Sequence, residues 1–534
     1  MGCAQDLKYQ GNKSRIIMDN IKVLWVDDEI ERLKPHLLFL EQKGYRVDTV
    51  NNGLDALDRV AEEEYQLVFL DENMPGMDGL ETLQRIKEMR ASLPVVMITK
   101  SEEESIMEEA IGSKISDYLI KPVNPKQILL SLKKNLDTAR LINAKTTSNY
   151  QQEFRQIAME LAQVGDWEAW QELYKKLVYW ELELDRIDEE GLREILQAQK
   201  KEANSQFFRF IEKTYPRWFG EEQAPVMSHT AFKAWVKPLL EKDRQVFLVL
   251  IDNLRYDQWR VMRPLLEEHF RVESEQSYYS ILPTATQYAR NAFFSGLLPA
   301  EMQKRFGDKW VSEDEEEGKN NYEADFLQDQ LQRLGLGQLS MHYEKVTQHH
   351  YGKKLAEQLS NLYPYTLNTI VYNFVDMLSH AKTEMKVIRE LADNDKAYRS
   401  LTLSWFSNSS LFDLLRQLAG RDLDVIITTD HGTINVEEPT KIVGEKSLNT
   451  NLRYKNGRGM TYVEKDVMEV KEPKALHLPQ QYLNSRFLFA REDRFFAYPN
   501  NYNHYVKHYR NTYQHGGISL EEMIVPFVHL RSKA

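Results

Sequence analysis

Residues 246–253 read Val246-Phe247-Leu248-Val249-Leu250-Ile251-Asp252-Asn253. The consecutive apolar residues predict a strand that is buried on both faces, as in a parallel sheet covered by helices. In such sheets the functional site lies beyond the carboxyl ends of the strands. Asp252 and Asn253 are therefore expected at the edge of the sheet where a site forms.

Two later apolar runs, at 368–375 and 425–429, also end in polar residues. They predict further strands of the same α/β sheet, with acids and imidazoles at its carboxyl edge. Another histidine stands before two glycines near the end of the chain. The side chains expected at this edge are Asp252, Asp376, His380, Asp430, His431 and His515.

Carboxylates and imidazoles together suit Zn²⁺ or Mn²⁺, which accept the same ligands. Asp376 and His380 are four residues apart, so on a helix they lie one turn apart and can share an ion. Asp430 and His431 are adjacent, and at a tight turn both can reach a metal. With Thr286 the set is large enough for two ions about 4 Å apart, the spacing used for in-line attack on phosphorus.

Thr286 lies in the stretch Leu282-Pro283-Thr284-Ala285-Thr286-Gln287, which we interpret as a loop that leads into a helix. Pro283 breaks the preceding structure, and the apolar spacing over 288–294 fits a helix. Free N–H groups at a helix N-terminus favour an anion, which suits a Thr286 alkoxide that attacks a phosphate. A plain helix N-cap is the alternative interpretation of this threonine.

In this order the residues resemble the alkaline phosphatase superfamily, through its PglZ branch. The matching motifs are Asp252, Thr286, Asp376-x-x-x-His380, Asp430-His431-Gly432 and His515-Gly516-Gly517. The resemblance implies one zinc ion on Asp252, Thr286, Asp430 and His431, and a second on Asp376, His380 and His515. It also implies that Thr286 is the nucleophile of a phosphodiesterase. Nucleotide pyrophosphatase/phosphodiesterases have a similar loop and an oxyanion-binding Asn, for which Asn291 is the nearest candidate.

Two regions are expected to contact the substrate. Residues 433–475 form an insertion between metal ligands, and its glycines predict a β-hairpin. Arg453 and Arg458 lie in this insertion, either as a basic lid that grips a phosphate or as an ordinary charged turn. Arg510 lies among the tyrosines of 498–513, which could stack on a base. The net charge of −12 favours a nucleotide or short oligonucleotide over a long duplex.

Residues 139–225 carry hardly any strand signal. Apolar residues recur there at spacings of three and four, which predicts amphipathic helices. We interpret this segment as a helical bundle that joins an N-terminal to a C-terminal domain, with core packing favoured over partner recognition for the stripe. The stripe consists of Trp167, Trp170, Leu173, Leu177, Trp180 and Leu184.

Residues 18–138 alternate regularly between apolar strands and helices, which predicts a second doubly wound parallel sheet of flavodoxin-like topology. Polar residues again follow the strands: Asp27 and Asp28, then Asp71, Thr99 and Lys121. Acids that converge at one edge repel each other unless a hard cation such as Mg²⁺ lies among them. A carboxylate such as Asp71 can then attack a phosphoryl donor to give an acyl phosphate.

This segment resembles the receiver domain of two-component response regulators. By that resemblance Asp27 and Asp28 form the acidic Mg²⁺ pair, and Asp71 is the phosphorylated residue. Thr99 matches the switch hydroxyl, Tyr118 the switch aromatic and Lys121 the lysine that precedes a proline.

Composition limits the remaining possibilities. The single cysteine excludes an intrachain disulfide and fits a reducing cytoplasm. No apolar run of about 18 residues occurs, so no membrane span is expected. Residues 1–17 are interpreted as a disordered or vector-derived extension. Direct binding to duplex DNA is not expected, because the chain is acidic and shows no helix-turn-helix pattern.

The order of receiver, helical bundle (139–225) and PglZ-type domain (226–534) resembles response regulators linked to type IX secretion. The resemblance implies that a sensor histidine kinase phosphorylates Asp71, which promotes homodimerisation and controls a two-zinc phosphodiesterase. The alternative is a signalling adaptor: its metal-bound C-terminal domain, with hydrolysis vestigial, binds a secretion component or a transcription factor such as a sigma factor.

Overall fold

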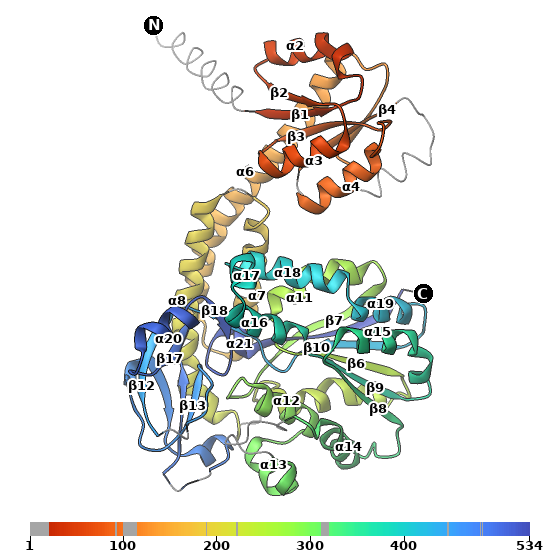
Figure 1. Ribbon diagram of the computed structural model, residues 1–534. Coiled ribbons are helices and arrows are strands. Elements are labelled where there is room, and N and C mark those ends of the chain that lie inside the picture. Colours follow the sequence, from red (N-terminus) through yellow and green to blue (C-terminus); the bar gives the residue numbers. More distant parts are fainter. Residues whose placement is uncertain are drawn as a thin grey trace. The chain divides into compact units, whose positions relative to one another are not determined.

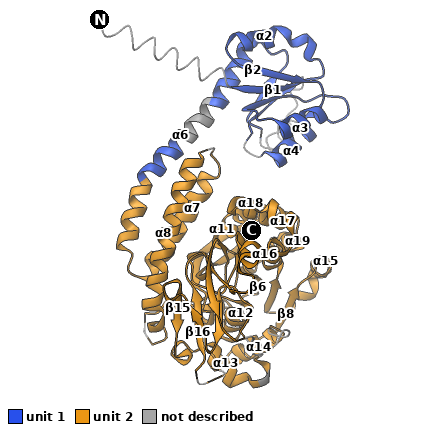
Figure 2. Ribbon diagram, turned by 60° about the vertical axis from the view of Figure 1, so that its left-hand side comes forward, with its two compact units in different colours: residues 1–152 blue, residues 153–534 orange. Residues whose placement is uncertain are grey.

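The computed structural model describes residues 21–90, 93–99, 115–187, 189–220, 223–310, 320–445, 448–480, 482 and 484–533. The extension predicted at residues 1–17 lies outside these residues. The chain divides into two compact units, residues 1–152 and 153–534 (Figure 2). The helices predicted to join two domains therefore belong, from residue 153 onward, to the same unit as the C-terminal sheet.

Unit 1 contains a five-stranded parallel sheet in the order β2-β1-β3-β4-β5. The chain places β2 on one side of β1 and then β3 on the other side. This change of side creates a crevice at the carboxyl ends of β1 and β3. The predicted flavodoxin-like fold is confirmed. Its elements are β1 (Lys22–Val26), α2 (Lys34–Gln42), β2 (Arg46–Val50), α3 (Gly53–Glu62), β3 (Leu67–Asp71), α4 (Gly79–Met89), β4 (Val95–Thr99), β5 (Asp117–Ile120) and α6 (Pro125–Gln163).

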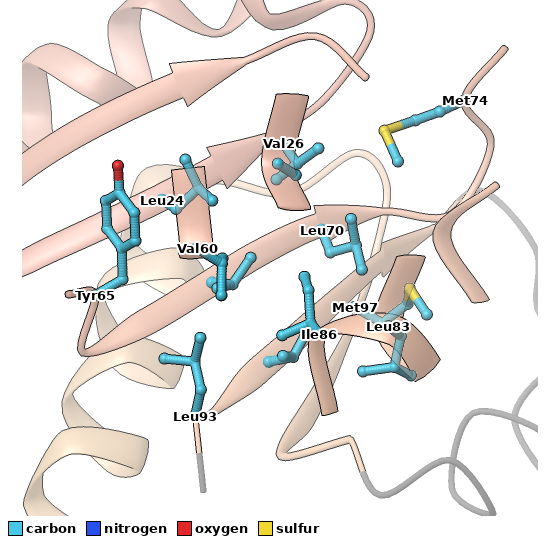
Figure 3. Close-up of a cluster of buried hydrophobic side chains, with 13 residues drawn as sticks. Leu24, Val26, Val60, Tyr65, Leu70, Met74, Leu83, Ile86, Leu93 and Met97 are labelled. Carbon is cyan, nitrogen blue, oxygen red and sulfur yellow. The ribbon is translucent and has the colours of Figure 1, made fainter. Parts of the chain in front are cut away.

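The sheet of unit 1 is buried on both faces because consecutive strand residues point in opposite directions. On one face, Leu24, Val26 and Leu70 pack against Val60 of α3 and Ile86 of α4 (Figure 3). On the other face, the strands pack against α2 and the start of α6 through Leu40, Ile128 and Leu132. This two-sided burial explains why these strands read as continuous apolar runs.

Two long helices, α7 (Trp167–Leu184) and α8 (Glu190–Thr214), follow the last part of α6 in unit 2. The predicted apolar stripe on α7 is buried from Trp170 to Leu184, so core packing is its role. Phe207 of α8 lies between Trp170 and Tyr279 of the C-terminal sheet, with ring centroids 5.2 and 6.4 Å away. Aromatic packing therefore attaches these helices to the sheet.

Buried charges join the same helices to the sheet domain. Lys200 of α8 pairs with Glu181 of α7 at 2.7 Å. Arg399, far along the chain, binds both Glu181 at 2.8 Å and Asp257 at 2.7 Å. Removing one member of such a network leaves an uncompensated buried charge, which is strongly destabilising. The network thus holds the helices in one arrangement against unit 2.

The central sheet of unit 2 has six strands in the order β7-β19-β10-β6-β9-β8. Strands β10, β6, β9 and β8 are parallel, and β19 and β7 extend the sheet in antiparallel pairings. The predicted α/β fold of this domain is confirmed (Figure 1). The strands are β6 (Val246–Ile251), β7 (Phe270–Tyr279), β8 (Met341–Val346), β9 (Leu367–Tyr372), β10 (Asp424–Thr428) and β19 (Ile524–Ser532).

Helices connect these strands, and three of them matter for the site: α12 (Thr286–Ser295), α16 (Phe374–Glu384) and α18 (Asp395–Ser407). The strand predicted at 368–375 ends earlier, at Tyr372, because the helix that carries Asp376 begins at Phe374. The other main helices are α11 (Tyr256–Glu267), α13 (Pro299–Phe306), α14 (Glu323–Arg333), α15 (His349–Glu357), α17 (Lys386–Leu391), α19 (Ser410–Leu418), α20 (Tyr502–Tyr509) and α21 (Leu520–Met523).

The insertion after β10 is larger than predicted. It contains two three-stranded sheets, β14-β12-β17 and β13-β16-β15. The prediction of a simple hairpin is wrong, because β13 (Tyr454–Gly457) and β14 (Thr461–Tyr462) pair in different sheets. Their partners come from elsewhere in the insertion: β12 (Glu438–Val443), β15 (Val467–Val470), β16 (Arg486–Ala490) and β17 (Arg494–Ala497). A short pair, β11 (Ile434–Val436) with β18 (Thr512–Gln514), closes the insertion.

Across the part of the chain that the structure describes, no helix combines the length and apolarity needed to cross a bilayer.

Phe207→Ala is expected to destabilise unit 2 by about 3–5 kcal/mol, because it removes a fully buried ring between two aromatic neighbours. Unfolding in urea, followed by tryptophan fluorescence, would show an earlier midpoint. Ile195→Ala, on an exposed position of the same helix, is the control and should change stability by less than about 0.5 kcal/mol. Equal midpoints for the two variants would contradict the role given to Phe207.

Candidate functional site

Strand ends of unit 2 converge on one site. Asp252 directly follows β6, and Asp430 and His431 follow β10 by two and three residues. Asp376 and His380 lie on α16, which begins just after β9, while His515 follows β18. Because β6, β9 and β10 are parallel neighbours, their carboxyl ends meet at one edge of the sheet. The residues predicted from four distant parts of the sequence are thus brought together.

The first group consists of Asp252, Asp430 and His431, whose ligand atoms all lie within 4.8 Å of one another. His431 Nε2 is 3.6 Å from Asp430 Oδ2 and 4.0 Å from Asp252 Oδ1. The Thr286 hydroxyl lies 3.0 Å from the same His431 nitrogen. The hydroxyl predicted as nucleophile therefore lies against the first group.

The second group consists of Asp376, His380 and His515, again with ligand atoms within 4.8 Å. His380 Nε2 is 3.5 Å from Asp376 Oδ2, as the four-residue spacing on α16 requires. His515 Nε2 is 3.9 Å from Asp376 Oδ1. These three residues present two imidazoles and one carboxylate to a common point.

The two groups are adjacent. The His431 and His515 rings stack with centroids 4.2 Å apart. Asn253 also spans both groups: its backbone N–H donates to Asp430 Oδ1 at 3.3 Å, and its side-chain amide donates to Asp376 Oδ1 at 3.4 Å. Asn253 has a φ of 64°, a left-handed conformation that Asn tolerates better than most residues. This turn fixes one acid of each group.

Both central imidazoles have their far nitrogen next to a carbonyl. His431 Nδ1 lies 3.1 Å from the Gly432 oxygen, and His515 Nδ1 lies 3.2 Å from the Thr284 oxygen. An Nδ1–H that donates to a carbonyl leaves Nε2 as the lone-pair nitrogen, the arrangement typical of metal-ligating histidines. Burial and the neighbouring His431 lower the pKa of His515 well below its usual value, so it is neutral and able to bind a metal.

Arg290 is the main residue that the sequence interpretation missed. It lies one helical turn after Thr286 on α12, and its side chain is fully buried. Its guanidinium forms ion pairs with Asp252 and with Asp430, at 3.0 Å to the latter, and with Glu323 at 3.4 Å. An arginine four residues after a candidate nucleophile, in an otherwise uncharged helix, is the signal that could have identified it.

Arg290 also sets the charge of the acids beside it. Burial alone raises the pKa of a carboxyl group, but Arg290 and His431 keep the pKa of Asp430 below its usual value. The pKa of Asp252 is raised well above its usual value, because burial and the nearby Asp430 and Asp376 outweigh the attraction of Arg290. The guanidinium therefore compensates only part of the negative charge at this edge.

The donor set fits two divalent cations. Asp252 Oδ1 is buried and accepts no hydrogen bond from the described residues, so the lone pairs of this oxygen are available to a metal ion. The Arg290 guanidinium pairs with Asp252 and Asp430 but not with Asp376, while Glu323 is also paired with Lys345 at 3.4 Å. One divalent ion would neutralise the three acids, and a second would make the site cationic. Mixed carboxylate and imidazole ligands suit Zn²⁺ or Mn²⁺.

Thr286 is the first residue of α12, and its N-cap is Ala285 with extended backbone. A threonine that caps the helix would stand one position earlier, so the alternative of a plain N-cap is not what the structure shows. The helix dipole favours negative charge at this end. Thr284, two residues before, bonds through its hydroxyl to Gly516 N–H at 3.0 Å and to Gly517 oxygen at 2.9 Å. This contact holds the Thr286 loop against the His515 loop.

Arg453 requires a correction. Its side chain is fully buried, and Glu522 binds the guanidinium at 2.7 and 3.1 Å. Glu522 in turn accepts the Gly517 N–H at 2.9 Å. The prediction that Arg453 grips substrate is wrong, because its charge is neutralised inside the protein. The pair supports the glycine turn after His515 instead.

The other predicted substrate residues are placed differently. Arg458 is half exposed and pairs with Glu445 at 3.0 Å. Arg510 is exposed, and its Nε donates to the Glu437 oxygen at 3.0 Å. Asn291 is buried, and its amide nitrogen donates to the Gln287 oxygen at 2.8 Å. Substrate contact by these three residues stays a prediction.

Unit 1 brings its own predicted residues together. Carboxylate oxygens of Asp27, Asp28 and Asp71 lie within 4.8 Å of one another. Lys121 Nζ bridges Asp71 at 2.7 Å and Asp27 at 2.9 Å. Burial and the nearby Asp27 raise the pKa of Asp71, although Lys121 acts in the opposite direction. An all-oxygen set of this kind fits Mg²⁺.

The two residues of unit 1 that are predicted to act as a switch, Thr99 and Tyr118, lie beside this acidic edge. The fully buried Thr99 hydroxyl donates to Glu72, the residue after Asp71. Tyr118 also interacts with Thr99, and burial raises the pKa of its phenol. Because the Thr99 hydroxyl is hydrogen-bonded to the residue after Asp71, a phosphoryl group on Asp71 would alter the surroundings of Thr99.

Fold and site thus define a phospho-receiver linked to an alkaline-phosphatase-like α/β domain, and comparison with known proteins agrees. Residues 231–530, more than half of the chain, match the BREX system PglZ alkaline phosphatase-like domain. Residues 140–219 match the PorX response regulator linker domain, and residues 23–133 match the response regulator receiver domain. The chain belongs to the PglZ alkaline-phosphatase-like family, with the three-part architecture of PorX-type response regulators.

Curated relatives resemble the receiver portion. The transcriptional regulatory protein ZraR of Klebsiella oxytoca is 38 % identical over 129 residues, which are 24 % of this chain and 29 % of the relative. The regulatory protein ResD of Bacillus subtilis is 35 % identical over 112 residues, 21 % of this chain and 46 % of the relative. The chain spans less than half the length of these relatives.

Solved structures resemble the same portion. A CheY-like receiver domain from Methanospirillum hungatei is 27 % identical and covers 22 % of this chain and 94 % of its own, with a TM-score of 0.22. The BeF3-activated DrrB receiver domain is 32 % identical and covers 22 % of this chain and 97 % of its own, with a TM-score of 0.21.

Arg290→Met is expected to destabilise the metal-free protein by about 3–5 kcal/mol, because it leaves Asp252 and Asp430 as uncompensated buried acids. Zinc should restore the melting temperature by a larger amount than it adds to the wild type, since the ions supply the missing positive charge.

Arg305→Met, which removes an exposed arginine paired with Asp329, is the control and should change stability by about 1 kcal/mol or less. If the melting temperature of Arg290→Met lies below that of the wild type by the same amount with and without zinc, the guanidinium does not compensate these acids.

Proposed function

We propose that this protein is a response regulator in which phosphorylation of Asp71 controls a two-zinc phosphodiesterase. The observation that carries the proposal is the position of Thr286, whose hydroxyl lies 3.0 Å from His431 Nε2 beside two adjacent Asp/His groups. Each group offers three ligands, and the histidine stack joins them. A structural threonine would not require this surrounding set.

The chain's own residues account for the chemistry as follows. Thr286 Oγ attacks the phosphorus of a diester, and the bond from phosphorus to the leaving alcohol oxygen breaks. The Thr286 proton leaves with the departing alcohol, and the phosphoryl group stays on Thr286 as an ester that still carries the second alcohol. Water then attacks the phosphorus, the bond from phosphorus to Thr286 Oγ breaks, and a phosphomonoester is released as the Thr286 hydroxyl forms again. The N-terminal end of α12 stabilises negative charge beside Thr286. Bound divalent ions would acidify the Thr286 hydroxyl and neutralise a phosphoryl oxygen.

Arg290 favours a diester over a monoester. A monoester carries one negative charge more than a diester, and binding it calls for an additional cation near the phosphoryl oxygens. Arg290 is the guanidinium next to Thr286, but it is already bound by Asp252, Asp430 and Glu323. The singly charged diester is therefore the better match. The substrates proposed are nucleotide or short oligonucleotide phosphodiesters, with Zn²⁺ preferred because three imidazoles face the site.

The receiver supports the regulatory half of the proposal. A sensor histidine kinase would supply the phosphoryl group to Asp71, with Mg²⁺ on Asp27, Asp28 and Asp71 and with Lys121 pairing the phosphoryl oxygens. Phosphorylation would promote homodimerisation and so alter hydrolysis. Like the response regulators whose three-part order it shares, the protein would act in the cytoplasm and regulate type IX secretion.

The adaptor hypothesis has one observation in its favour. Exposed apolar side chains gather on α16 and α17, next to the second ligand group: Met377, Met385, Val387 and Leu391 are 46–63 % exposed. Such a surface fits a secretion component or a sigma factor. Partner binding that survives Thr286→Ala and fails with Asp71→Ala would favour this function.

Thr286→Ala is expected to reduce hydrolysis of bis(4-nitrophenyl) phosphate by about a thousandfold or more, because it removes the nucleophile. Zinc-loaded wild type should hydrolyse this diester faster than 4-nitrophenyl phosphate, and Thr286→Ser should keep measurable turnover. Zinc content and melting temperature serve as controls for folding. Equal turnover by Thr286→Ala, with zinc confirmed bound, would exclude Thr286 as the nucleophile.

Acetyl phosphate with Mg²⁺ is expected to increase the mass of the wild-type protein from monomer to dimer in sedimentation velocity and to change diester turnover. Asp71→Asn should abolish both responses, because the amide cannot form the acyl phosphate. Asp58→Asn, on an exposed position of α3, is the matched control and should respond like wild type. Dimerisation of Asp71→Asn under the same conditions would contradict the proposed switch.

A further inference from the structure

A cavity lined mainly by charged and polar residues lies at the end of the helix that carries Asp376 and His380. Its volume is about 440 Å³, and it is formed by the end of α16, by Arg389 of α17 and Asp393 just after that helix, and by α20 with the residues that follow it. Four of its lining residues are cations and one is an acid. The lining consists of Lys382, Arg389, Asp393, Asn503, Val506, Lys507, Arg510 and Asn511.

The four cations of this cavity form no ion pair within the described chain, although Asp395 and Asp393 lie close enough to Lys382 to attract it. None of Lys382, Arg389, Lys507 and Arg510 has a carboxylate of the described residues within 4.0 Å, and Asp393 lines the cavity without reaching any of them. Other arginines of the same unit behave differently: Arg290, Arg399 and Arg453 all have acidic partners. Four unpaired cations around one cavity, in a chain of net charge −12, form a local positive potential.

Lys382 makes the strongest case for a ligand. Its side chain is fully buried, and its Nζ has no hydrogen-bond partner among the described residues. The Nζ lies 4.2 Å from the centroid of the Tyr513 ring, a cation–π contact that compensates part of its charge. Burying an ammonium group without a hydrogen-bonding partner is costly. An anion in the cavity would lower that cost.

The arginines are positioned before any ligand binds. Arg389 donates from Nε to the Lys382 oxygen at 3.3 Å and from its terminal amine to the Thr383 oxygen, so it closes the C-terminal end of α16. Arg510 is held by its bond to the Glu437 oxygen. Guanidinium groups that are already oriented lose less entropy when they bind a phosphate.

The cavity and the metal-ligand groups share two segments of the chain. Lys382 follows His380 by two residues on α16, and six residues separate Asp376 from Lys382, about 9 Å along the helix. Arg510 and Asn511 lead directly into β18 and then to His515. Gln514 joins the two segments through a bond to the Thr383 hydroxyl at 3.2 Å. A chain molecule can therefore reach both places at once.

We propose that this cavity binds a second phosphate group of the substrate, one that is linked to the diester under attack at Thr286. This inference rests on the proposed function and adds to it that substrates contain at least two phosphates. The same residues would also accept a phosphate from a separate molecule, and the experiment distinguishes these two sources.

The test measures binding of a fluorescein-labelled trinucleotide, which contains two phosphodiesters, to full-length zinc-loaded Thr286→Ala protein by fluorescence anisotropy. Lys507→Ala in this background should weaken binding about fivefold at 0.1 M salt, because one phosphate contact is lost. The slope of log affinity against log salt should fall by about 0.7. Arg510→Ala should act alike. Lys386→Ala, an exposed lysine of α17 outside the cavity, is the control and should change neither quantity.

Zinc removal identifies the source of the phosphate. If the phosphate belongs to the substrate, chelation weakens trinucleotide binding and Lys507→Ala weakens it further. Binding that depends on Lys507 but is unaffected by chelation would indicate a separate phosphate ligand and overturn the proposal. Unchanged affinity and salt slope in both cavity variants would overturn it as well.

A kinetic arm separates this proposal from the proposed function. In protein with Thr286 intact, Lys507→Ala should raise the KM for the trinucleotide relative to that for bis(4-nitrophenyl) phosphate, which has a single phosphate. If Lys507→Ala turns over both substrates and the ratio of the two KM values is unchanged, the role proposed for the cavity is wrong, but the proposed function stands. Absence of turnover in the zinc-loaded wild type would overturn the proposed function.

Discussion

The C-terminal domain depends on one buried interaction, the Arg290 guanidinium enclosed by Asp252, Asp430 and Glu323. Like charges at the end of a parallel sheet repel each other, and desolvation increases the cost. The Arg290 guanidinium lowers the free-energy cost of these buried acids in the metal-free protein and still leaves an excess of negative charge. That excess would attract divalent ions, so the same pairing accounts for the stability of the site and supports the metal binding that we propose.

In the receiver, a different cation reduces the repulsion among acids at the carboxyl edge of the sheet. Lys121 bridges Asp27 and Asp71 at the edge of a smaller parallel sheet, as Arg290 bridges Asp252 and Asp430. The difference lies in exposure. Lys121 is partly accessible and on a flexible stem, so it can follow a phosphoryl group, whereas Arg290 is fully buried and has a planar group bound on several sides. The first arrangement suits a switch and the second suits a fixed catalytic edge.

The helices α7 and α8 are held by buried charges against the domain that carries the two Asp/His groups. They are not an independent bundle, because Glu181 of α7 forms buried ion pairs with both Lys200 of α8 and Arg399, and Arg399 also pairs with Asp257. Arg255, which binds Asp257 and also Asp395 at 2.8 Å, lies three residues after Asp252. A displacement of α7 would therefore disturb ion pairs that end next to the metal-ligand edge. This is a contiguous path of packed charges, and its coupling energy is what double-mutant cycles would measure.

Local patterns were sufficient for much of this molecule. Apolar runs predicted the buried strands, the four-residue spacing predicted Asp376 and His380 on one helix face, and strand ends predicted which acids would meet, because parallel topology brings carboxyl ends to one edge. Contacts between distant residues were not predictable in this way. The sequence suggested that Arg453 is a surface cation, but in the structure it is buried and paired with Glu522, which lies 69 residues away in the chain. Arg290, the pairing of β13 with β16, and the unpaired cations around Lys382 likewise depend on which segments the tertiary fold places side by side. Strand identity and helical spacing are properties of neighbouring residues, whereas the compensation of a buried charge depends on partners that only folding supplies.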